Sequence, residues 1–211
     1  VSGSGEDVIK DIFTTAVSQN YHPLTILSLR MNSNNCKSCP EGISPKPFIR
    51  GNIILHILNS LLVLILVYLL TGRNLAASVL TSLVFAVHPM HVESVAWIAE
   101  RKDVLYSFFF LSGLIAFTQF INVSKRRFLL LTATFLLFIL SCLSKATAVI
   151  FPLVLILLIF WFNYDEEGGF LKSLKETFSI RNFLILLPFF AVSLFIGIMA
   201  VKLQSNESFA G

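Results

Sequence analysis

Long apolar runs separated by short polar links constrain the fold of this chain more than any other feature. A helix needs about 20 apolar residues to cross the roughly 30 Å hydrocarbon core of a bilayer. Backbone groups inside a bilayer must be hydrogen-bonded within the protein, and these runs lack the alternation of barrel strands, so helices are favoured. The sequence therefore predicts an all-α, multi-pass transmembrane helical bundle, with spans at residues 52–70, 75–87, 104–122, 128–143, 146–162 and 183–201.

Composition and charge support this class and argue against others. Hydrophobic residues make up 55% of the 211 residues and charged residues only 13%, whereas a soluble domain carries about 25% charged residues. The formal net charge is +4, and the basic residues lie between the apolar runs rather than in an aromatic-rich basic patch. We therefore expect an integral membrane protein whose partners include membrane lipid and no nucleic acid.

The polar segments divide between the two ends of the predicted bundle. Residues 1–51 form a loop, with a short helix expected at 8–17, and residues 202–211 form a tail. Both lie on the same side as residues 88–103. The compact turn at residues 125–127 has three consecutive basic residues and lies at the opposite end of the bundle. Basic loops are typical of the cytoplasmic side, so we expect the end with residues 125–127 to be cytoplasmic. The first side is then extracytoplasmic, facing either a bacterial periplasm or the endoplasmic reticulum lumen.

The segment from His88 to Asp103 carries the densest cluster of reactive groups. It contains two histidines, three carboxylates, two cations and a tryptophan between apolar runs. Ionisable groups at a bilayer boundary are costly to desolvate, so such a cluster is a functional-site candidate. Pro89 suits the first turn of a helix, and we expect an amphipathic helix over residues 89–103 that lies in the membrane interface.

In such a helix, Glu93, Trp97 and Arg101 form a column about 12 Å long on one face. A carboxylate, an aromatic ring and a guanidinium in a row suit a sugar phosphate. The ring can stack on a pyranose face, and arginine can contact phosphate in a bidentate manner. The alternative is that Trp97 and Arg101 are membrane anchors, which are common at interfaces.

The other polar residues of this segment also allow two interpretations. His88 and His91 can share a divalent metal with Glu93. Their spacing is not that of a zinc protease, however, and no third distant ligand is visible, so we assign no metal. Asp103 comes just before a span, where it is either a substrate-binding residue or an acid favoured by the helix dipole.

A second polar group lies outside this segment but on the same predicted side. Tyr21, His22 and Arg30 form an aromatic, histidine and arginine cluster in the first loop. Lys145 lies in a very short link between two spans and can hold a phosphate, although a lone lysine more often snorkels to the interface. The shortness of this link also places Pro152 inside a span.

Two further features carry less functional information. His56 and Asn59 lie three residues apart in the first span, where we expect them to hydrogen-bond between helices. Cys36 and Cys39 form a C-K-S-C pair in the first loop, which is either a disulfide or a weak metal signal.

Four blocks of this chain resemble, in the same order, the membrane portion of the transmembrane and tetratricopeptide-repeat O-mannosyltransferases and their bacterial relatives. The most specific block is His88-Pro-Met-His-Val-Glu-Ser-Val-Ala-Trp-Ile-Ala-Glu-Arg-Lys-Asp103. The resemblance covers most of the chain from about residue 8 onward, and its blocks are residues 21–29, 52–59, 88–103 and 143–152.

The resemblance implies a GT-C glycosyltransferase fold with its active site on the extracytoplasmic face. The donor would be a polyprenyl- or dolichyl-phosphate sugar, mannose in the first instance, and the acceptor a serine or threonine hydroxyl of a protein. The donor-binding residues would come from the two polar groups already described: Tyr21, His22, Arg30, His88, His91, Glu93, Trp97, Arg101, Asp103 and Lys145. A lipid-linked sugar phosphate is the implied ligand, and no cofactor or metal is assigned.

The chain departs from the family in two respects. The family's catalytic aspartate follows a span that would lie upstream of residue 1, and we do not transfer that role to Glu6-Asp7. We therefore expect a fragment of a longer chain, from a bacterial relative, that lacks the catalytic aspartate and the family's C-terminal repeats. Ser144-Lys145-Ala146 stands where most relatives have Ser-Lys-Glu, which leaves an acidic role there in doubt.

A different class of function remains open at this point. A non-catalytic scaffold or a transporter could also be built from such a bundle. A transporter places polar groups near the bilayer midplane and interrupts helices in related halves. Here the ionisable groups concentrate at one interface, which favours chemistry on a lipid-linked headgroup.

Overall fold

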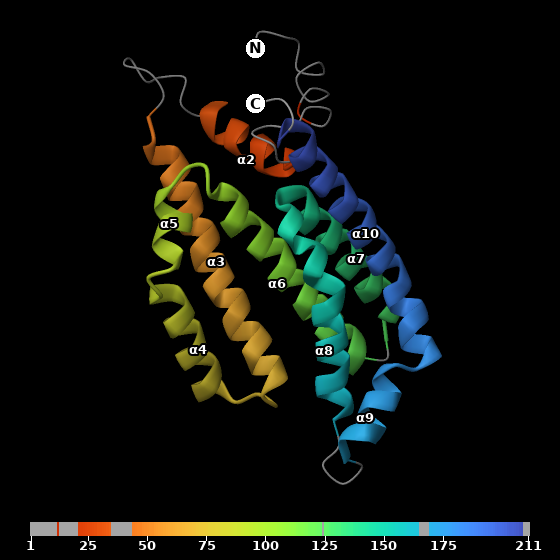
Figure 1. The fold of residues 1–211 in the computed structure, drawn as a ribbon. Coiled ribbons are helices and arrows are strands. Elements are labelled where there is room, and N and C mark those ends of the chain that lie inside the picture. The colour runs from red at the N-terminus through yellow and green to blue at the C-terminus, as the bar shows by residue number, and fades with distance from the viewer. Residues whose placement is uncertain (1–11, 13–20, 35–43, 124, 165–168, 209–211) are drawn as a thin grey trace.

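The computed structural model describes residue 12 and residues 21–34, 44–123, 125–164 and 169–208. Within these residues every regular element is a helix (Figure 1). The elements are α2 (Pro23–Asn34), α3 (Lys46–Leu70), α4 (Leu75–Val87), α5 (His91–Ala96), α6 (Arg101–Asn122), α7 (Arg127–Ser144), the 3-10 helix η1 (Ala146–Ile150), α8 (Phe151–Asn163), α9 (Gly169–Thr177) and α10 (Ile180–Ser208).

Five segments are long and apolar enough to cross a membrane: Lys46–Leu70, Arg101–Asn122, Arg127–Ser144, Ala146–Asn163 and Ile180–Leu203. The helix Leu75–Val87 is apolar but shorter. In Figure 1 the long helices run side by side, α2 lies across one end of the bundle and α9 lies at the opposite end. The prediction of an all-α, multi-pass membrane bundle is confirmed.

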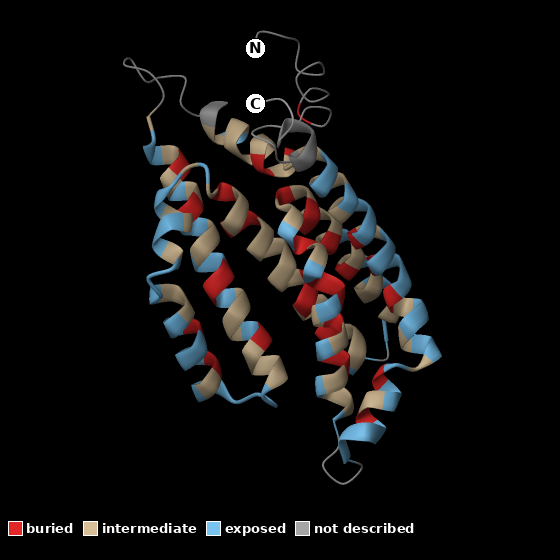
Figure 2. Ribbon diagram, in the orientation of Figure 1, coloured by how far each residue is buried: buried red, intermediate tan, exposed pale blue. Residues whose placement is uncertain are grey.

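The core forms where the long helices face one another. Phe117, Phe138, Phe151 and Phe189 are almost completely buried, and the rings of Phe138 and Phe151 stack with their centroids 5.2 Å apart. The outward faces of the helices carry exposed leucine, isoleucine and phenylalanine side chains, as the pale blue of the outer ribbons indicates (Figure 2). An apolar outer surface of this kind matches the hydrocarbon that surrounds a membrane bundle.

Close packing in the core depends on a glycine of α6. A Cβ atom added at Gly113 would lie 2.9 Å from the ring of Phe151. Small residues at helix interfaces let neighbouring helices approach closely where the bilayer supplies no hydrophobic driving force. Gly113 therefore fixes the spacing between α6 and the start of α8.

Pro152 lies inside the span Ala146–Asn163, as the sequence predicted. The chain follows the 3-10 helix η1 up to Ile150, and Pro152 then occupies the first turn of α8. The first turn of a helix tolerates proline, since its missing N–H has no intrahelical partner. The sequence analysis did not predict the short helix α9. The expected helix at residues 8–17, Glu6-Asp7 and the Cys36–Cys39 pair lie outside the described residues, apart from Ile12.

Candidate functional site

The expected helix over residues 89–103 is instead two helices joined by a turn. Helix α5 ends at Ala96, Trp97 has an extended backbone (φ −94°, ψ 128°), and α6 begins at Arg101. The prediction of one continuous helix is therefore wrong, and Glu93, Trp97 and Arg101 do not form a column.

Asn52 of α3 explains why α5 ends where it does. Its side-chain amide donates hydrogen bonds to the carbonyl oxygens of Ser94 (3.5 Å), Val95 (3.2 Å) and Trp97 (3.0 Å). The last carbonyls of a helix lack intrahelical partners, and here a fully buried side chain from another helix supplies a donor. A neighbouring helix thus provides the cap that the local sequence lacks.

Glu93, Trp97 and Arg101, which were predicted to share one helix face, lie in different environments. Trp97 is 61% exposed and Glu93 is also exposed. Arg101 is only 3% exposed, and its guanidinium donates to the carbonyl oxygen of Phe48 (2.8 Å) and to the hydroxyl of Ser28 (3.2 Å). Arg101 therefore joins α6 to α2 and α3.

Gly51 makes room for this buried guanidinium. A Cβ atom added at Gly51 would lie 2.5 Å from Nη2 of Arg101 and 2.8 Å from the side-chain nitrogen of Asn32. The glycine is thus a requirement of the Arg101 contacts. The sequence placed Gly51 at the end of the first loop and gave no indication of this role.

Asp103 and Lys145 form an ion pair that joins the start of α6 to the link between α7 and η1. The ammonium group of Lys145 also lies 5.7 Å from the centre of the Tyr106 ring. Both charged side chains are about a quarter exposed. The structure therefore assigns Asp103 a partner and shows that Lys145 is held in place rather than extended freely to the interface.

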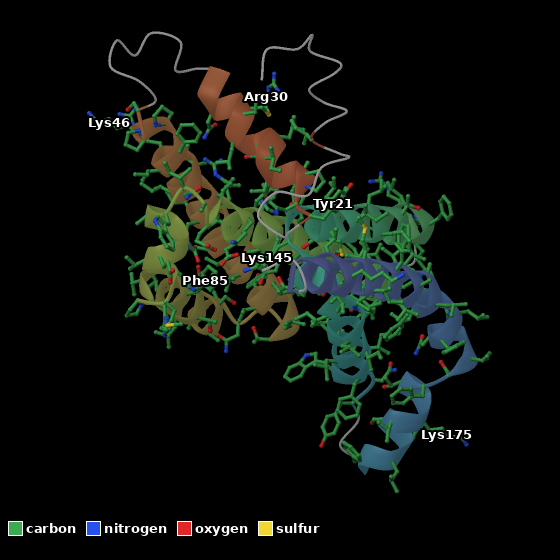
Figure 3. All side chains as sticks on the ribbon, turned by 45° about the horizontal axis from the view of Figure 1, so that its top comes forward. Tyr21, Arg30, Lys46, Phe85, Lys145 and Lys175 are labelled. Carbon is green, nitrogen blue, oxygen red and sulfur yellow. The ribbon has the colours of Figure 1, made fainter. Side chains whose placement is uncertain are left out.

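A cavity of about 320 Å³ lies beside Lys145, and the two residues just before α2 form part of its wall. The hydroxyl of Thr25 donates to the carbonyl oxygen of Ser144 (3.0 Å), which ties α2 to the end of α7. In Figure 3, Tyr21 lies at the end of α2 near Lys145, whereas Arg30 lies toward the other end of α2. The cavity is lined by Tyr21, His22, Glu100, Lys102, Ser144, Lys145 and Ala146.

Charged groups of both signs line this cavity. Glu100 and Lys102 form an ion pair of 3.2 Å, with both side chains partly exposed. Lys102 and Lys145 therefore approach the cavity from two different elements, and each has a carboxylate partner. Two ammonium groups held in this way can receive a phosphate, because charge-assisted hydrogen bonds to phosphate are among the stronger ones.

A histidine cluster lies beside the ion pair. The ring of His91 lies 5.3 Å from that of His56, 6.1 Å from that of His88 and 4.4 Å from that of Phe85. Asp103, His56 and His91 line a second cavity of about 250 Å³. Burial lowers the pKa of His91 below its usual value, and the neighbouring His56 and then His88 lower it further. His91 therefore favours the neutral form.

The expected interhelical hydrogen bonds of the first span are present. The ring nitrogen Nε2 of His56 donates to the carbonyl oxygen of Ala86 (3.0 Å), and the Asn59 amide donates to the carbonyl oxygen of Val104 (2.9 Å). Asn52 and Asn59 of α3 therefore bind the backbone at Trp97 and at Val104, the two ends of the segment that joins α5 to α6. The sequence analysis did not predict the role of Asn52, although an asparagine in a span itself indicates an interhelical contact.

The described residues contain no group of three histidine, cysteine, aspartate or glutamate side chains arranged to hold a metal ion. His88 and His91 contact each other through their rings, and Glu93 is not part of this cluster. We assign no role to a metal at this site.

The structure thus separates the predicted site residues into groups. Tyr21, His22 and Lys145 line one cavity, and Asp103 is paired with that lysine. His88 and His91 form a neighbouring cluster with His56. Arg101 is occupied by backbone and hydroxyl contacts, and the side chains outside both groups are those of Arg30, Glu93 and Trp97.

Curated relatives confirm the resemblance that the sequence predicts. The chain is 33% identical over 110 residues to protein O-mannosyl-transferase TMTC1 of Mus musculus, covering 52% of this chain and 11% of that protein. It is 37% identical over 113 residues to TMTC4 of Mus musculus, covering 48% and 15%. It is 33% identical over 101 residues to TMTC3 of Homo sapiens, covering 48% and 10%.

The chain spans only a small part, 10–15%, of the length of these three relatives. No family model and no solved structure matches it. Each alignment covers about half of this chain.

Proposed function

We propose that this chain is part of an integral-membrane glycosyltransferase of the protein O-mannosyltransferase kind. The reaction would transfer a sugar, mannose in the first instance, from a polyprenyl- or dolichyl-phosphate donor to a serine or threonine hydroxyl of a protein. The relatives bear the name protein O-mannosyl-transferase. The observation that carries the proposal for this chain is the charged cavity beside Lys145 at one end of an apolar bundle.

The location of the cavity suits a lipid-linked donor. A polyprenyl-phosphate sugar keeps its apolar tail in the bilayer and its charged headgroup at the surface. The cavity lies at the end of α7 and the start of α6, where apolar spans meet the polar segment. From the loop charges we propose that this end is extracytoplasmic.

Lys145 and Lys102 are the proposed ligands of the donor phosphate. When the bond between the sugar and the phosphate breaks, negative charge on the departing lipid phosphate increases. Cations already held in position stabilise that charge without reorganising during the reaction. Asp103 positions Lys145, and Glu100 positions Lys102, through the ion pairs described above.

The remaining predicted residues take different proposed roles. Tyr21 and His22 form the wall of the cavity contributed by the chain that enters α2, where they can contact the sugar. Arg101 positions α2 over the cavity rather than contacting phosphate, since its guanidinium is bonded to Phe48 and Ser28. Exposed Trp97 suits the alternative role of an interfacial anchor. The general base that removes the acceptor proton is proposed to be the family's aspartate, outside the described residues.

Sugar transfer by the protein expressed from its complete gene tests this function. Membranes would receive labelled dolichyl-phosphate mannose and an acceptor protein extract. We expect Lys145→Gln to lower the transfer rate about 100-fold, because one preorganised charge at the reacting phosphate is lost. Lys145→Arg keeps the charge and should retain part of the rate.

Lys125→Gln is the matched control, because Lys125 is exposed at the other end of the bundle and removal of its charge is equivalent. It should leave the rate unchanged. Equal transfer rates for Lys145→Gln and the wild type would mean that this cavity does not bind the donor phosphate. Absence of transfer from any lipid-linked sugar would instead favour a scaffold.

A further inference from the structure

A further polar cavity, separate from the two described above, lies at the end of the bundle opposite to α2. It has a volume of about 250 Å³ and an apolar floor that includes Phe117 and Ile159. Helices α6, α7, α8 and α10 meet there, near α9 at the end of the bundle opposite to α2 in Figure 1. Its polar lining consists of two arginines and two asparagines: Arg127, Arg181, Asn163 and Asn182.

The fold brings these side chains together at the starts of two helices. Arg127 is the first residue of α7, and Arg181 is the second residue of α10. The amide of Asn182 donates to the carbonyl oxygens of Glu176 and Thr177 (both 3.1 Å), which holds α9 against the start of α10. The N-terminal ends of helices add positive potential to that of the two guanidinium groups.

The two arginines have no acidic partner within the part of the chain that the structure describes. The ion pairs found there are those of Glu100 with Lys102 and Asp103 with Lys145, at the other end. The guanidinium of Arg127 lies over the ring of Phe120 at 5.7 Å, and its Nε is buried without a hydrogen-bond partner. Because no described carboxylate pairs with either guanidinium that lines the cavity, the cavity favours an anionic ligand.

Helix α9 indicates that this cavity lies at the level of lipid headgroups. Phe170 and Leu171 are 59% and 79% exposed, while the small polar residues Ser173 and Thr177 are buried. Lys172 and Lys175 lie on the same short helix, and Lys175 is seen at the far end of the molecule in Figure 3. A helix that exposes aromatic and aliphatic side chains beside lysines suits the boundary between acyl chains and headgroups.

Apolar side chains also border the basic lining. Phe128 is next to Arg127 and Ile180 is next to Arg181, and both are strongly exposed. The cavity itself also has an apolar lining, so a ligand that contacts the arginines meets apolar side chains as well; this lining consists of Phe117, Phe120, Ile121, Ile159 and Ile185. This combination fits a phosphate that carries acyl chains better than a free phosphate.

We propose that this cavity binds the phosphate of an anionic phospholipid headgroup. Arg127 and Arg181 contact the phosphate oxygens, Asn163 contributes a neutral polar group, and the acyl chains lie along the exposed apolar surface. Basic pockets between membrane helices are a known way of holding such headgroups. The site lies at the opposite end from the Lys145 cavity, so it does not depend on the proposed glycosyltransferase function.

Thermal unfolding of the purified protein in zwitterionic detergent tests the proposal without an activity assay. The melting temperature would be followed during titration with short-chain phosphatidylglycerol, short-chain phosphatidylcholine or glycerol 3-phosphate. A ligand that binds only the folded state raises the melting temperature. We expect phosphatidylglycerol to stabilise the protein, and the other two compounds to have little effect.

Variants locate the effect within the structure. Arg127→Gln and Arg181→Gln should each weaken phosphatidylglycerol binding about tenfold, the loss expected for one charge-assisted contact. Lys125→Gln removes an exposed charge two residues from Arg127 and should bind like the wild type. Arg127→Lys keeps the charge and provides a folded comparison if Arg127→Gln unfolds.

Each other outcome would overturn a definite part of the proposal. Equal stabilisation of the wild type and all variants would mean that the lipid acts through general surface charge. Equal stabilisation by glycerol 3-phosphate would mean that the cavity binds a free phosphate monoester rather than a lipid. No stabilisation by phosphatidylglycerol would mean that no such site exists.

Discussion

The two ends of the bundle use their positive charges in different ways. At the end covered by α2, Lys145 and Lys102 are paired with Asp103 and Glu100, and the buried Arg101 is bonded to backbone and hydroxyl oxygens. At the opposite end, the described residues offer no carboxylate partner to Arg127 or Arg181. The first end holds its cations in fixed positions, and we propose that the second binds an external anion.

This difference separates a site for chemistry from a site for anchoring. A cation that stabilises charge developing during a reaction must be in place beforehand, which the ion pairs of the first end achieve. Partly exposed ion pairs contribute little to stability, so the pairs of Lys145 and Lys102 are better explained by positioning. A structural lipid needs only complementary charge and an apolar surface, which the second end provides.

Among the substitutions at the end covered by α2, loss of the Arg101 guanidinium should reduce the stability of the protein most. Arg101→Ala removes the contacts that join α6 to Phe48 and Ser28 and leaves a cavity. We expect a loss of about 3 kcal/mol in the free energy of unfolding. Thermal unfolding in detergent, together with hydrogen exchange of α2, would show whether α2 detaches first.

Gly51→Ala sharpens this prediction through a double-mutant cycle. In the wild type the added Cβ would lie 2.5 Å from Nη2 of Arg101 and should destabilise the protein. Where Arg101 is already alanine, the same change should be much milder, because alanine is the better helix former. Additive effects of the two substitutions would contradict the contact.

Replacement of Asn52 should have the next largest effect. Asn52→Leu leaves the carbonyl oxygens of Ser94, Val95 and Trp97 without their donor, and we expect a loss of about 2 kcal/mol. Hydrogen exchange should rise in residues 91–100 while α7 and α10 remain protected. Unchanged exchange in this segment would mean that α5 ends for another reason.

The sequence predicted the spans well because their signal is local. Runs of apolar residues specify a helix that faces lipid whatever its neighbours are, and the expected run at residues 75–87 coincides with α4. The end of α5 at Ala96 could not be predicted in this way. It depends on Asn52, which lies far away in sequence but donates to the carbonyls of this segment.

The predicted residues include Tyr21, His22 and Lys145 of the cavity lining, but the sequence did not predict how these residues come together. The pairing of Lys145 with Asp103 and the hydrogen bond from Thr25 of α2 to Ser144 result from packing between distant segments. Helical periodicity placed Arg101 beside Trp97, whereas burial places it against Phe48. The polar lining at the opposite end was invisible because its arginines come from the starts of separate helices.

Acidification should have the smallest effect among these tests. The pKa of His91 lies below its usual value because of burial and then because of the neighbouring His56 and His88. As the pH falls through about 6.5, the unfolded chain takes up a proton at this position while the folded protein does not, so stability decreases. We expect a lower melting temperature at about pH 5.5 than at about pH 7.5.

His91→Gln provides the comparison for this effect. Without the imidazole, the part of the decrease that belongs to His91 should disappear, and the melting temperature should depend less on pH. An equal pH dependence in the variant and the wild type would assign the effect to other groups.

The location of the donor phosphate tests the central claim most directly. A polyprenyl-phosphate mannose analogue with a photoreactive group beside its phosphate would be crosslinked to the protein in membranes, and the labelled peptides would be identified. The account predicts labelling of residues 21–25, 100–103 and 144–146, with loss of labelling when unlabelled donor is added. Labelling of residues 125–128 and 180–185 instead would contradict it, because the donor would then lie at the end assigned to the anionic lipid.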